Sequence, residues 1–249
     1  MFDLTGRRAI VTGSTRGIGR AIAEALVGQG ARVVITSECA EDARRVGSAL
    51  GMPSTECDVA NDAALDALTQ FAVAELGGID ILVCNAGITG RAGAFQDIDM
   101  ADYAQVMAVN LRSQVVLCNL GIPHIANAGG GAVILISSLA GLRGNRAINA
   151  YALAKAGNAQ LARNLAVEWG PQAVRVNAVS PGFIATDLSK PLLDDAAFMA
   201  RRMAMTPLRR PGQPEEIAGA VVFLAADAGG FVTGHNLVID GGTLITDGS

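Results

Sequence analysis

Histidine is scarce in this sequence, which contains only His124 and His235, far apart and outside any recognisable motif. A zinc site built on several histidines is therefore excluded, and we expect no metal site. A Ser-His-Asp hydrolase would need one of these two residues, and the chain has no G-x-S-x-G turn to present a serine. We expect both histidines to be surface or packing residues.

Basic runs, long apolar runs and paired cysteines are also missing. The net charge is -4 and Lys and Arg do not cluster, so nucleic acid is not expected as a partner. No apolar run is long enough to span a bilayer, and the first residues lack the shape of a signal peptide, so no membrane partner is expected. No C-x-x-C pair occurs, which predicts free, mostly buried thiols and a cytoplasmic protein, at Cys39, Cys57, Cys84 and Cys118.

Small and branched apolar residues are abundant, and 51% of the chain is hydrophobic. These are the residues of a parallel sheet that is buried on both faces. Hydrophobic periodicity predicts strands at 8–11, 32–36, 54–57, 79–84, 132–137, 174–179 and 237–239, and helices at 17–29, 41–50, 63–76, 100–122, 150–169 and 214–226. Strands and helices that alternate in this way indicate one α/β domain over 1–249, a doubly wound parallel sheet with helices on both faces.

One long stretch, 184–211, shows no clear periodicity and contains three prolines. A long irregular segment in a compact domain is often a binding loop, so we predict a substrate lid here. Ordinary helix packing or a subunit contact would use the same apolar side chains, which are Leu188, Leu192, Leu193, Phe198, Met199, Met203 and Met205.

The first predicted strand runs directly into a glycine-rich turn, and a helix begins there. Glycine lets the backbone turn sharply and approach a pyrophosphate, whose charge is stabilised at the helix N-terminus. The spacing G-x-x-x-G-x-G differs from the general G-x-G-x-x-G fingerprint, but its place between strand and helix predicts dinucleotide binding. The residues expected to contact the cofactor in this turn are Gly13, Ser14, Thr15, Arg16, Gly17, Ile18 and Gly19.

Cofactor choice depends on Glu38, which follows the second predicted strand. An acid at this place can accept hydrogen bonds from the adenosine ribose and repel a 2′-phosphate, which favours NAD. Arg16 favours NADP instead, because a guanidinium in the glycine-rich turn can pair with that phosphate. We expect NAD, with NADP as the alternative.

A Tyr-x-x-x-Lys motif, Tyr151 and Lys155, begins a long predicted helix, and this spacing places both side chains on one face. A neighbouring ammonium favours phenolate, so we expect Lys155 to lower the pKa of Tyr151 and make it a usable acid and base. Ser138 closes the fifth predicted strand thirteen residues earlier. Its hydroxyl would stand at the carboxyl end of the sheet and donate to a developing oxyanion.

These motifs together resemble the short-chain dehydrogenase/reductase family along essentially the whole chain. The matching residues are Thr12-Gly13, Gly17 and Gly19, Asp58-Val59, Asn85-Ala86-Gly87, Asn110, Ser138, Tyr151 with Lys155, Arg175-Val176-Asn177, Pro181-Gly182 and Thr186. The resemblance implies a seven-stranded Rossmann-like sheet in a homotetramer. It also implies an oxidoreductase that moves a hydride between NAD or NADP and a secondary alcohol or ketone.

The resemblance also implies roles for residues that the motifs alone do not assign. Asp58 and Val59 would lie near the adenine, and Asn85, Ala86 and Gly87 at the cofactor. Pro181, Gly182, Ile184 and Thr186 would lie at the nicotinamide. Asn110 would hold a water that relays protons to Lys155, and Lys155 would also bind the nicotinamide ribose.

The sequence departs from the family pattern in two places. Ser37 stands where many NAD-dependent members carry Asp, one residue before Glu38, which leaves cofactor choice open. The bacterial 3-oxoacyl-carrier-protein reductases carry a basic stretch before the fifth strand that suits an acidic carrier protein, whereas the corresponding residues here, 125–131, include no basic residue. Such a reductase therefore remains an alternative, and the chain looks closer to the sugar-acid and small-alcohol dehydrogenases. A non-enzymatic dinucleotide sensor is the alternative from another class of protein. A sensor is expected to lack part of the catalytic tetrad, whereas all four residues are present here, namely Asn110, Ser138, Tyr151 and Lys155.

Overall fold

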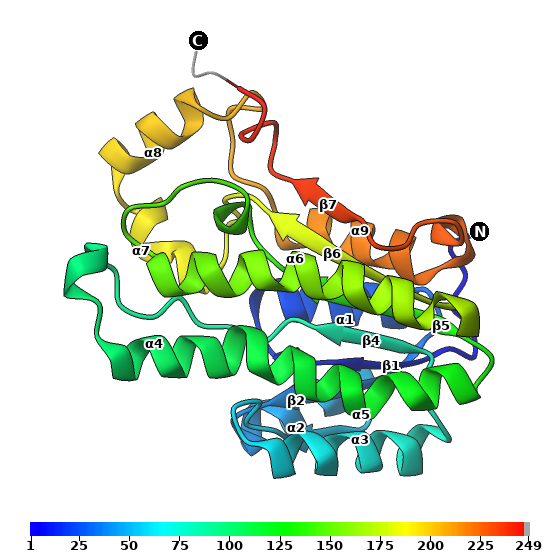
Figure 1. Ribbon diagram of the computed structural model, residues 1–249. Helices are drawn as coiled ribbons and strands as arrows, with labels where there is room; N and C mark the ends of the chain where they lie inside the picture. The colour runs from blue at the N-terminus through cyan, green and yellow to red at the C-terminus, as the bar shows by residue number, and fades with distance from the viewer. Residues whose placement is uncertain (247–249) are drawn as a thin grey trace.

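Seven short apolar strands form one parallel sheet in the computed structural model, which describes residues 1–246 (Figure 1). The last residues of the expected domain, 247–249, lie outside the described residues. The order across the sheet is β3-β2-β1-β4-β5-β6-β7. The strands are β1 (Arg8–Val11), β2 (Arg32–Ser37), β3 (Ser54–Glu56), β4 (Ile81–Cys84), β5 (Gly131–Ile136), β6 (Val174–Pro181) and β7 (Asn236–Ile239).

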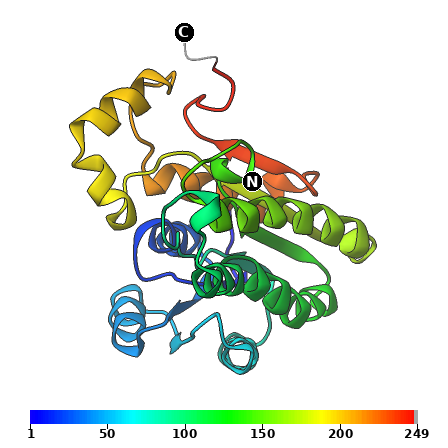
Figure 2. The same cartoon turned by 60° about the vertical axis from the view of Figure 1, so that its left-hand side comes forward.

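Helices cover both faces of the sheet, and each face has its own core (Figures 1 and 2). Alternate residues of a strand point to opposite faces, so Ile10 packs into one core while Ala9 and Val11 pack into the other. The first core includes side chains of α3 (Asp62–Leu76), α5 (Ser113–Asn127) and α6 (Asn149–Trp169). The second includes side chains of α1 (Gly17–Gly28), α2 (Ala40–Leu50) and α9 (Pro214–Ala225). The predicted doubly wound fold is confirmed.

The sheet reverses its winding at β1, which pairs with β2 on one side and with β4 on the other. Open α/β sheets bind ligands outside the carboxyl ends of the strands at such a switch point. The turns after β1 and β4 therefore form the floor of the candidate site.

The prediction of one continuous helix over 100–122 is wrong, both in where the helix ends and in its continuity. It consists of α4 (Met100–Met107), one π-helical turn η2 (Ala108–Arg112), and α5, which continues to Asn127. Gly121 does not end the helix, because it allows close packing: a Cβ there would lie 3.2 Å from a Leu82 methyl group. The helix passes Pro123 because Ile122 and Ile125 anchor it in the core.

The segment 184–211 is more regular than its sequence indicated. It contains the short turn η5 (Asp187–Ser189), α7 (Lys190–Leu193) and α8 (Ala196–Ala204), and α7 and α8 stand out from the body of the molecule (Figure 2). Asp195 caps α8 by accepting a hydrogen bond from Phe198 N at 2.9 Å. These helices are too short for periodicity to reveal them. The remaining short turns are η1 (Phe95–Asp97), η3 (Leu139–Gly141), η4 (Gly170–Gln172) and η6 (Asp227–Gly229).

The cysteines and histidines lie as the sequence analysis predicts. All four cysteines are free, and Cys39 is the exposed one. Both histidines are exposed. Over residues 1–246, no helix combines the length and the apolar character needed to cross a membrane.

Candidate active site

The glycine-rich turn between β1 and α1 is packed so tightly that side chains are excluded. Gly13 and Gly17 have φ values of +62° and +52°, a backbone region that glycine adopts easily. A Cβ at Gly19 would lie 2.1 Å from the Gly13 carbonyl oxygen. The first turn of α1 holds no acidic residue, so its amides present a positive helix end that suits a pyrophosphate. These features fit a dinucleotide.

Thr12 and Asn85 join the glycine-rich turn to the end of β4. The Thr12 hydroxyl accepts hydrogen bonds from the backbone N–H of Asn85 at 2.9 Å and of Ala86 at 3.1 Å. The Asn85 side-chain amide donates to the Thr12 and Gly13 carbonyls at 2.9 and 3.2 Å. Asn85 therefore shapes the turn that would hold a cofactor. The sequence analysis assigned no role to Thr12, although its place directly before Gly13 is a usable signal.

The end of the site near β2 carries a charged pair at the surface. Arg16 and Glu38, the two residues that favour opposite cofactors, form an ion pair at 2.9 Å. Both side chains are more than half exposed, so the pair contributes about 0–1 kcal/mol to stability. Ser37 is buried, and its hydroxyl accepts a hydrogen bond from Cys39 N at 3.2 Å.

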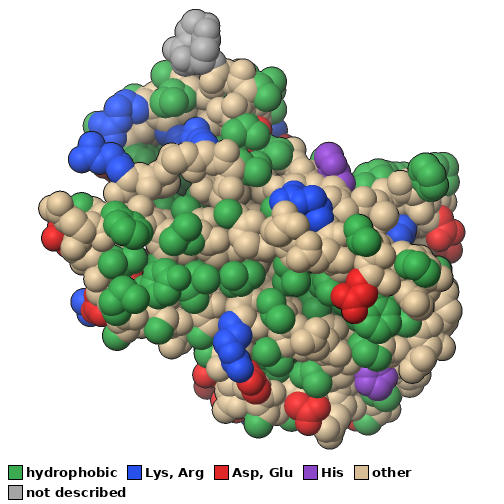
Figure 3. All heavy atoms as spheres, in the orientation of Figure 1, with side chains coloured by type: hydrophobic (Ala, Val, Ile, Leu, Met, Phe, Trp, Pro, Cys, Tyr) green, Lys and Arg blue, Asp and Glu red, His purple; other side chains and the backbone are tan. Residues whose placement is uncertain are grey.

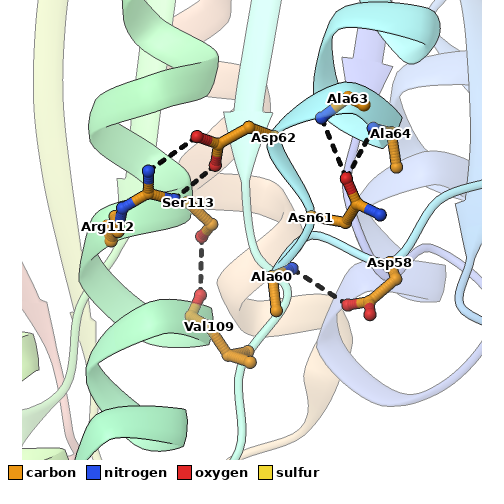
Figure 4. A network of polar contacts seen from close by, with 9 residues as sticks. All are labelled: Asp58, Ala60, Asn61, Asp62, Ala63, Ala64, Val109, Arg112 and Ser113. Atoms are coloured by element: carbon orange, nitrogen blue, oxygen red, sulfur yellow. Dashed lines mark hydrogen bonds and ion pairs between the residues drawn. The ribbon is translucent and has the colours of Figure 1, made fainter.

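Asp58 and Val59 lie in the turn that joins β3 to α3. Figure 4 shows Asp58 there, next to the start of α3. The Asp58 carboxylate accepts a hydrogen bond from Ala60 N at 2.9 Å, and Val59 is buried. At the start of α3, Asp62 forms an ion pair with Arg112 of η2, and Arg112 holds the pKa of the Asp62 carboxyl below its usual value. This pair ties the start of α3 to the π-helical turn that contains Asn110.

Ser138 and Tyr151 meet at the carboxyl end of β5. Ser138 caps η3, because its hydroxyl accepts a hydrogen bond from Ala140 N at 3.1 Å, and Tyr151 lies in the first turn of α6. Burial raises the pKa of Tyr151, and a hydrogen bond with the Ser138 side chain opposes this rise.

Lys155 is buried one helical turn beyond Tyr151, with Nζ 5.5 Å from the centroid of the tyrosine ring. Its Nζ donates a hydrogen bond to the Ile136 carbonyl at 2.8 Å. Burial lowers the pKa of Lys155 to about 8. The expectation that the Tyr151 pKa is lowered is wrong for this structure, because burial raises that pKa and the Lys155 ammonium is directed to the Ile136 carbonyl.

Asn110 is fully buried in η2, and its side chain forms hydrogen bonds with backbone groups. Its amide donates to the Ile88 and Val106 carbonyls at 2.8 and 2.9 Å, and its Oδ1 accepts from Ile88 N at 3.2 Å. The backbone carbonyl of Asn110 accepts a hydrogen bond from Asn158 Nδ2 at 3.1 Å. Asn158, on α6, is a contributor that sequence reasoning missed, because only the fold brings it to η2.

Gly87 marks the point where β4, η2 and α6 converge. A Cβ on Gly87 would lie 2.6 Å from Asn110 Oδ1 and 3.4 Å from Lys155 Nζ. The structure therefore brings together Gly87, Asn110 and Lys155, three residues that the sequence analysis named as candidates for the site.

The segment after β6 closes the site from the other side. A Cβ at Gly182 would lie 2.6 Å from Asp240 Cα, so only glycine fits there. Ile184 is buried and bridges to Gly212. A Thr186 methyl group would lie 3.5 Å from a Cβ on Gly17, which places Thr186 against the glycine-rich turn.

No cluster of metal-binding side chains accompanies this site. Among residues 1–246, His, Cys, Asp and Glu side chains form no group of three or more that could hold a metal ion.

Comparisons with known proteins agree with this arrangement. The family model described as enoyl-(acyl carrier protein) reductase matches residues 13–243. The cis-4-hydroxycyclohexanecarboxylate dehydrogenase of Sinomonas cyclohexanicum is 39% identical over 241 residues, which are 95% of this chain and 96% of that protein.

Solved structures match along nearly the whole chain. A 7α-hydroxysteroid dehydrogenase complexed with NADH and 7-oxo glycochenodeoxycholic acid is 36% identical, with a TM-score of 0.91 over 97% of this chain and 95% of that one. A gluconate 5-dehydrogenase of Burkholderia cenocepacia in complex with NADP and tartrate is 35% identical, with a TM-score of 0.92 over 98% of both chains.

Fold, site and comparisons together define an NAD(P)-dependent oxidoreductase that acts on CH–OH groups and moves a hydride between the nicotinamide and an alcohol or ketone. The chain belongs to the short-chain dehydrogenase/reductase family. It is thus an enzyme, and the non-enzymatic sensor is not supported.

Proposed function

We propose that Ser138, Tyr151 and Lys155 carry out the proton chemistry of this oxidoreductase, with Asn110 positioning the segment beside them. The observation that carries the proposal is the buried Lys155, whose Nζ lies 5.5 Å from the centroid of the Tyr151 ring, with Tyr151 in the first turn of α6. The nicotinamide, when bound, supplies or accepts the hydride at the substrate carbon.

Tyr151 is the group suited to transferring the proton. Its raised pKa keeps the phenol protonated at neutral pH, so it can give a proton to a ketone oxygen. The Ser138 hydroxyl donates to the same oxygen as negative charge develops there. Lys155, with its pKa lowered to about 8, changes protonation close to neutral pH and can return the proton to Tyr151.

The substitution Tyr151→Phe tests this assignment. It keeps the ring, so we expect NADH binding to survive while turnover falls by roughly 10²–10⁴-fold. Tyr103→Phe changes the only other tyrosine of the chain, on α4, and should leave turnover unchanged. The measurements are NADH titration and NADH oxidation with a panel of ketones. Near-normal turnover by a folded Tyr151→Phe variant would contradict the proposal.

We also propose that NAD(H) is preferred over NADP(H). Glu38 supports this, because an acid that follows the second strand of such a fold repels a 2′-phosphate, and its ion pair occupies the Arg16 guanidinium that could bind that phosphate. Comparing kcat/KM for the two cofactors decides the point, and a higher value for NADPH would refute it.

The segment 184–211 is proposed as the substrate lid. Its support is the contact of α8 with the loop after β6, where the Phe198 and Phe183 ring centroids are 5.5 Å apart. Deuterium exchange with and without bound ligand tests this role. Unchanged protection of 184–211 on ligand binding would count against it.

Two further proposals concern assembly and location. Exposed apolar side chains on α5 and α6, including Val115, Leu153 and Val167, support a homotetramer. Light scattering should then give four times the chain mass, and Val167→Glu should lower it. A monomer at micromolar concentration would contradict the tetramer.

The free thiols support a cytoplasmic enzyme, which cell fractionation tests.

A further inference from the structure

The π-helical turn η2 has two successive carbonyl groups that side chains bind. At its end the backbone N–H of Ser113 reaches the Ala108 carbonyl, five residues earlier, whereas in a regular α-helix it would donate to Val109. The Ser113 hydroxyl donates to the Val109 carbonyl instead, at 2.6 Å (Figure 4). The next carbonyl, that of Asn110, accepts a hydrogen bond from Asn158 Nδ2 of α6 at 3.1 Å. Side chains therefore help to hold the widened turn.

Close packing of α6 on η2 brings Asn158 to this carbonyl. A Cβ on Gly157 would lie 2.8 Å from a Leu111 methyl group, so a larger residue there would push the two helices apart. Asn158 and Asn110 are both fully buried. Figure 3 shows many apolar side chains on the face of the molecule where α4, α5 and α6 lie. The bond between the two asparagines is thus shielded from water, which strengthens it.

The side chain of Asn110 is fixed as firmly as its carbonyl. Both N–H groups of its amide are used, by the Ile88 and Val106 carbonyls, and its Oδ1 accepts from Ile88 N. A Cβ built on Gly87 would meet Asn110 Oδ1 at 2.6 Å and Lys155 Nζ at 3.4 Å. The two polar atoms therefore lie close to the same point, and the position of η2 decides how near Oδ1 is to the ammonium.

Asn158 joins η2 to the helix that carries Tyr151 and Lys155, because all three residues lie on α6. We propose that Asn158 is a positioning residue for the reaction: its amide holds η2 against α6 and keeps Asn110 Oδ1 beside Lys155 Nζ. The inference rests on the proposed function, because it concerns the proton chemistry that is assigned to Tyr151 and Lys155.

A purely stabilising role explains Asn158 less well. Its Oδ1 is buried and accepts no hydrogen bond from the residues that the structure describes. A buried amide with an unpaired oxygen is unfavourable, and an apolar side chain of similar size would avoid that cost. The amide thus stands where stability alone would favour leucine, as expected of a residue that serves the geometry of the site.

Asn158→Leu tests the role, because leucine has a similar volume and no donor. A shift of about 1 Å in a site can lower turnover roughly 100-fold, so we expect kcat to fall by about 10–100-fold. Asn158 binds η2 rather than the glycine-rich turn, so KM and the Kd of NADH should stay within about 2-fold. The measurement is NADH oxidation with 4-oxocyclohexanecarboxylate and 7-oxocholate, using the ketone that the wild-type enzyme reduces faster.

Crystal structures of the wild-type enzyme and the variant with NADH give a readout that does not depend on turnover. We expect Asn110 Oδ1 to move away from Lys155 Nζ by about 0.5 Å or more when the amide of Asn158 is lost. Asn158→Ala removes the same donor without adding bulk. It should show the same loss of kcat and the same displacement if leucine prevents folding.

Thr69→Val is the matched control, because it also removes a buried side-chain donor from a helix carbonyl. Thr69 Oγ1 donates to the Leu65 carbonyl at 2.9 Å within α3. Valine has nearly the same shape, and no residue of α3 takes part in the proposed proton chemistry. Its kcat should equal that of the wild-type enzyme even if the unfolding temperature falls.

The outcomes separate the inference from the proposed function. If the Asn158 variants fold with wild-type kcat and an unmoved Asn110, the inference is wrong, while an inactive Tyr151→Phe variant still supports the proposed function. If kcat, KM and NADH affinity worsen together, if Thr69→Val lowers kcat equally, or if neither Asn158 variant folds, Asn158 serves the stability of the fold and the inference is again wrong. Near-normal turnover by Tyr151→Phe would refute the proposed function itself.

Discussion

The substitution Gly19→Ala tests how tightly the glycine-rich turn is packed. The new methyl group would lie 2.1 Å from the Gly13 carbonyl oxygen and 2.3 Å from Asn85 Nδ2, whereas real Cβ atoms stay beyond 3.0 Å. The turn or Asn85 must therefore move, although Gly19 lies inside a regular helix where alanine is ordinarily favourable.

The expected cost combines two effects. Overpacking a well-filled site costs about 1–3 kcal/mol. Displacing Asn85 also weakens its hydrogen bonds to the Thr12 and Gly13 carbonyls, which adds about 1 kcal/mol. For a chain of this size, a loss of about 2–4 kcal/mol lowers the unfolding temperature by roughly 4–16 °C. We also expect weaker NADH binding, because the amides of the turn are displaced.

Calorimetric unfolding and NADH fluorescence titration measure the two effects. Gly28→Ala is the matched control, because it lies in the last turn of the same helix and a Cβ there meets nothing within 4 Å. It should leave NADH affinity unchanged and stability equal or slightly higher. A Gly19→Ala variant with wild-type unfolding temperature and wild-type NADH affinity would refute the packing argument.

Three other results are expected. Glu38→Arg should shift the ratio of kcat/KM towards NADP(H), because it replaces a repelling carboxylate with a guanidinium, and an unchanged ratio would exclude Glu38 as the determinant. Asp80→Asn should cost roughly 2–3 kcal/mol in denaturant unfolding, because Asp80 is nearly buried and binds Arg8 at 2.7 Å, whereas Asp62→Asn breaks an exposed pair and should lower stability clearly less. Burial lowers the pKa of Lys155 from 10.5 to about 8, so between these pH values the unfolded chain binds more protons than the folded one. Stability should therefore rise with pH across that window. Lys155→Met should flatten this rise, and an equal slope of stability against pH in both proteins would contradict the argument.

The sheet was predictable because its strands are buried on both faces and read as short apolar runs. Strand β1 begins and ends at the predicted residues, and the other strands differ by one or two residues at their ends. The interruption at η2 was not predictable, because an unbroken helical pattern runs through Asn110. The helices α7 and α8 escaped detection for a different reason, since four and nine residues give periodicity too little length.

The candidate site was predictable where its residues follow strand ends. Ser138 and Gly87 follow directly from the position of a strand, because parallel strands end at one edge of the sheet. The contact of Asn158 with Asn110 depends on how helices pack across the fold. The direction of the Tyr151 pKa shift could not be predicted from the sequence either. It depends on the burial of the phenol and on the direction of the Lys155 side chain, which donates to the Ile136 carbonyl.

The central position of β1 has a consequence for synthesis of the chain. This strand is made first, but one of its edges pairs with β4, where Ile10 lies opposite Leu82. Until the ribosome has delivered β4, the nascent chain carries an uncovered apolar strand edge, the kind of surface that recruits chaperones and seeds aggregation. Translation speed over the first third of the message should therefore affect the yield of folded enzyme more than speed over the last third.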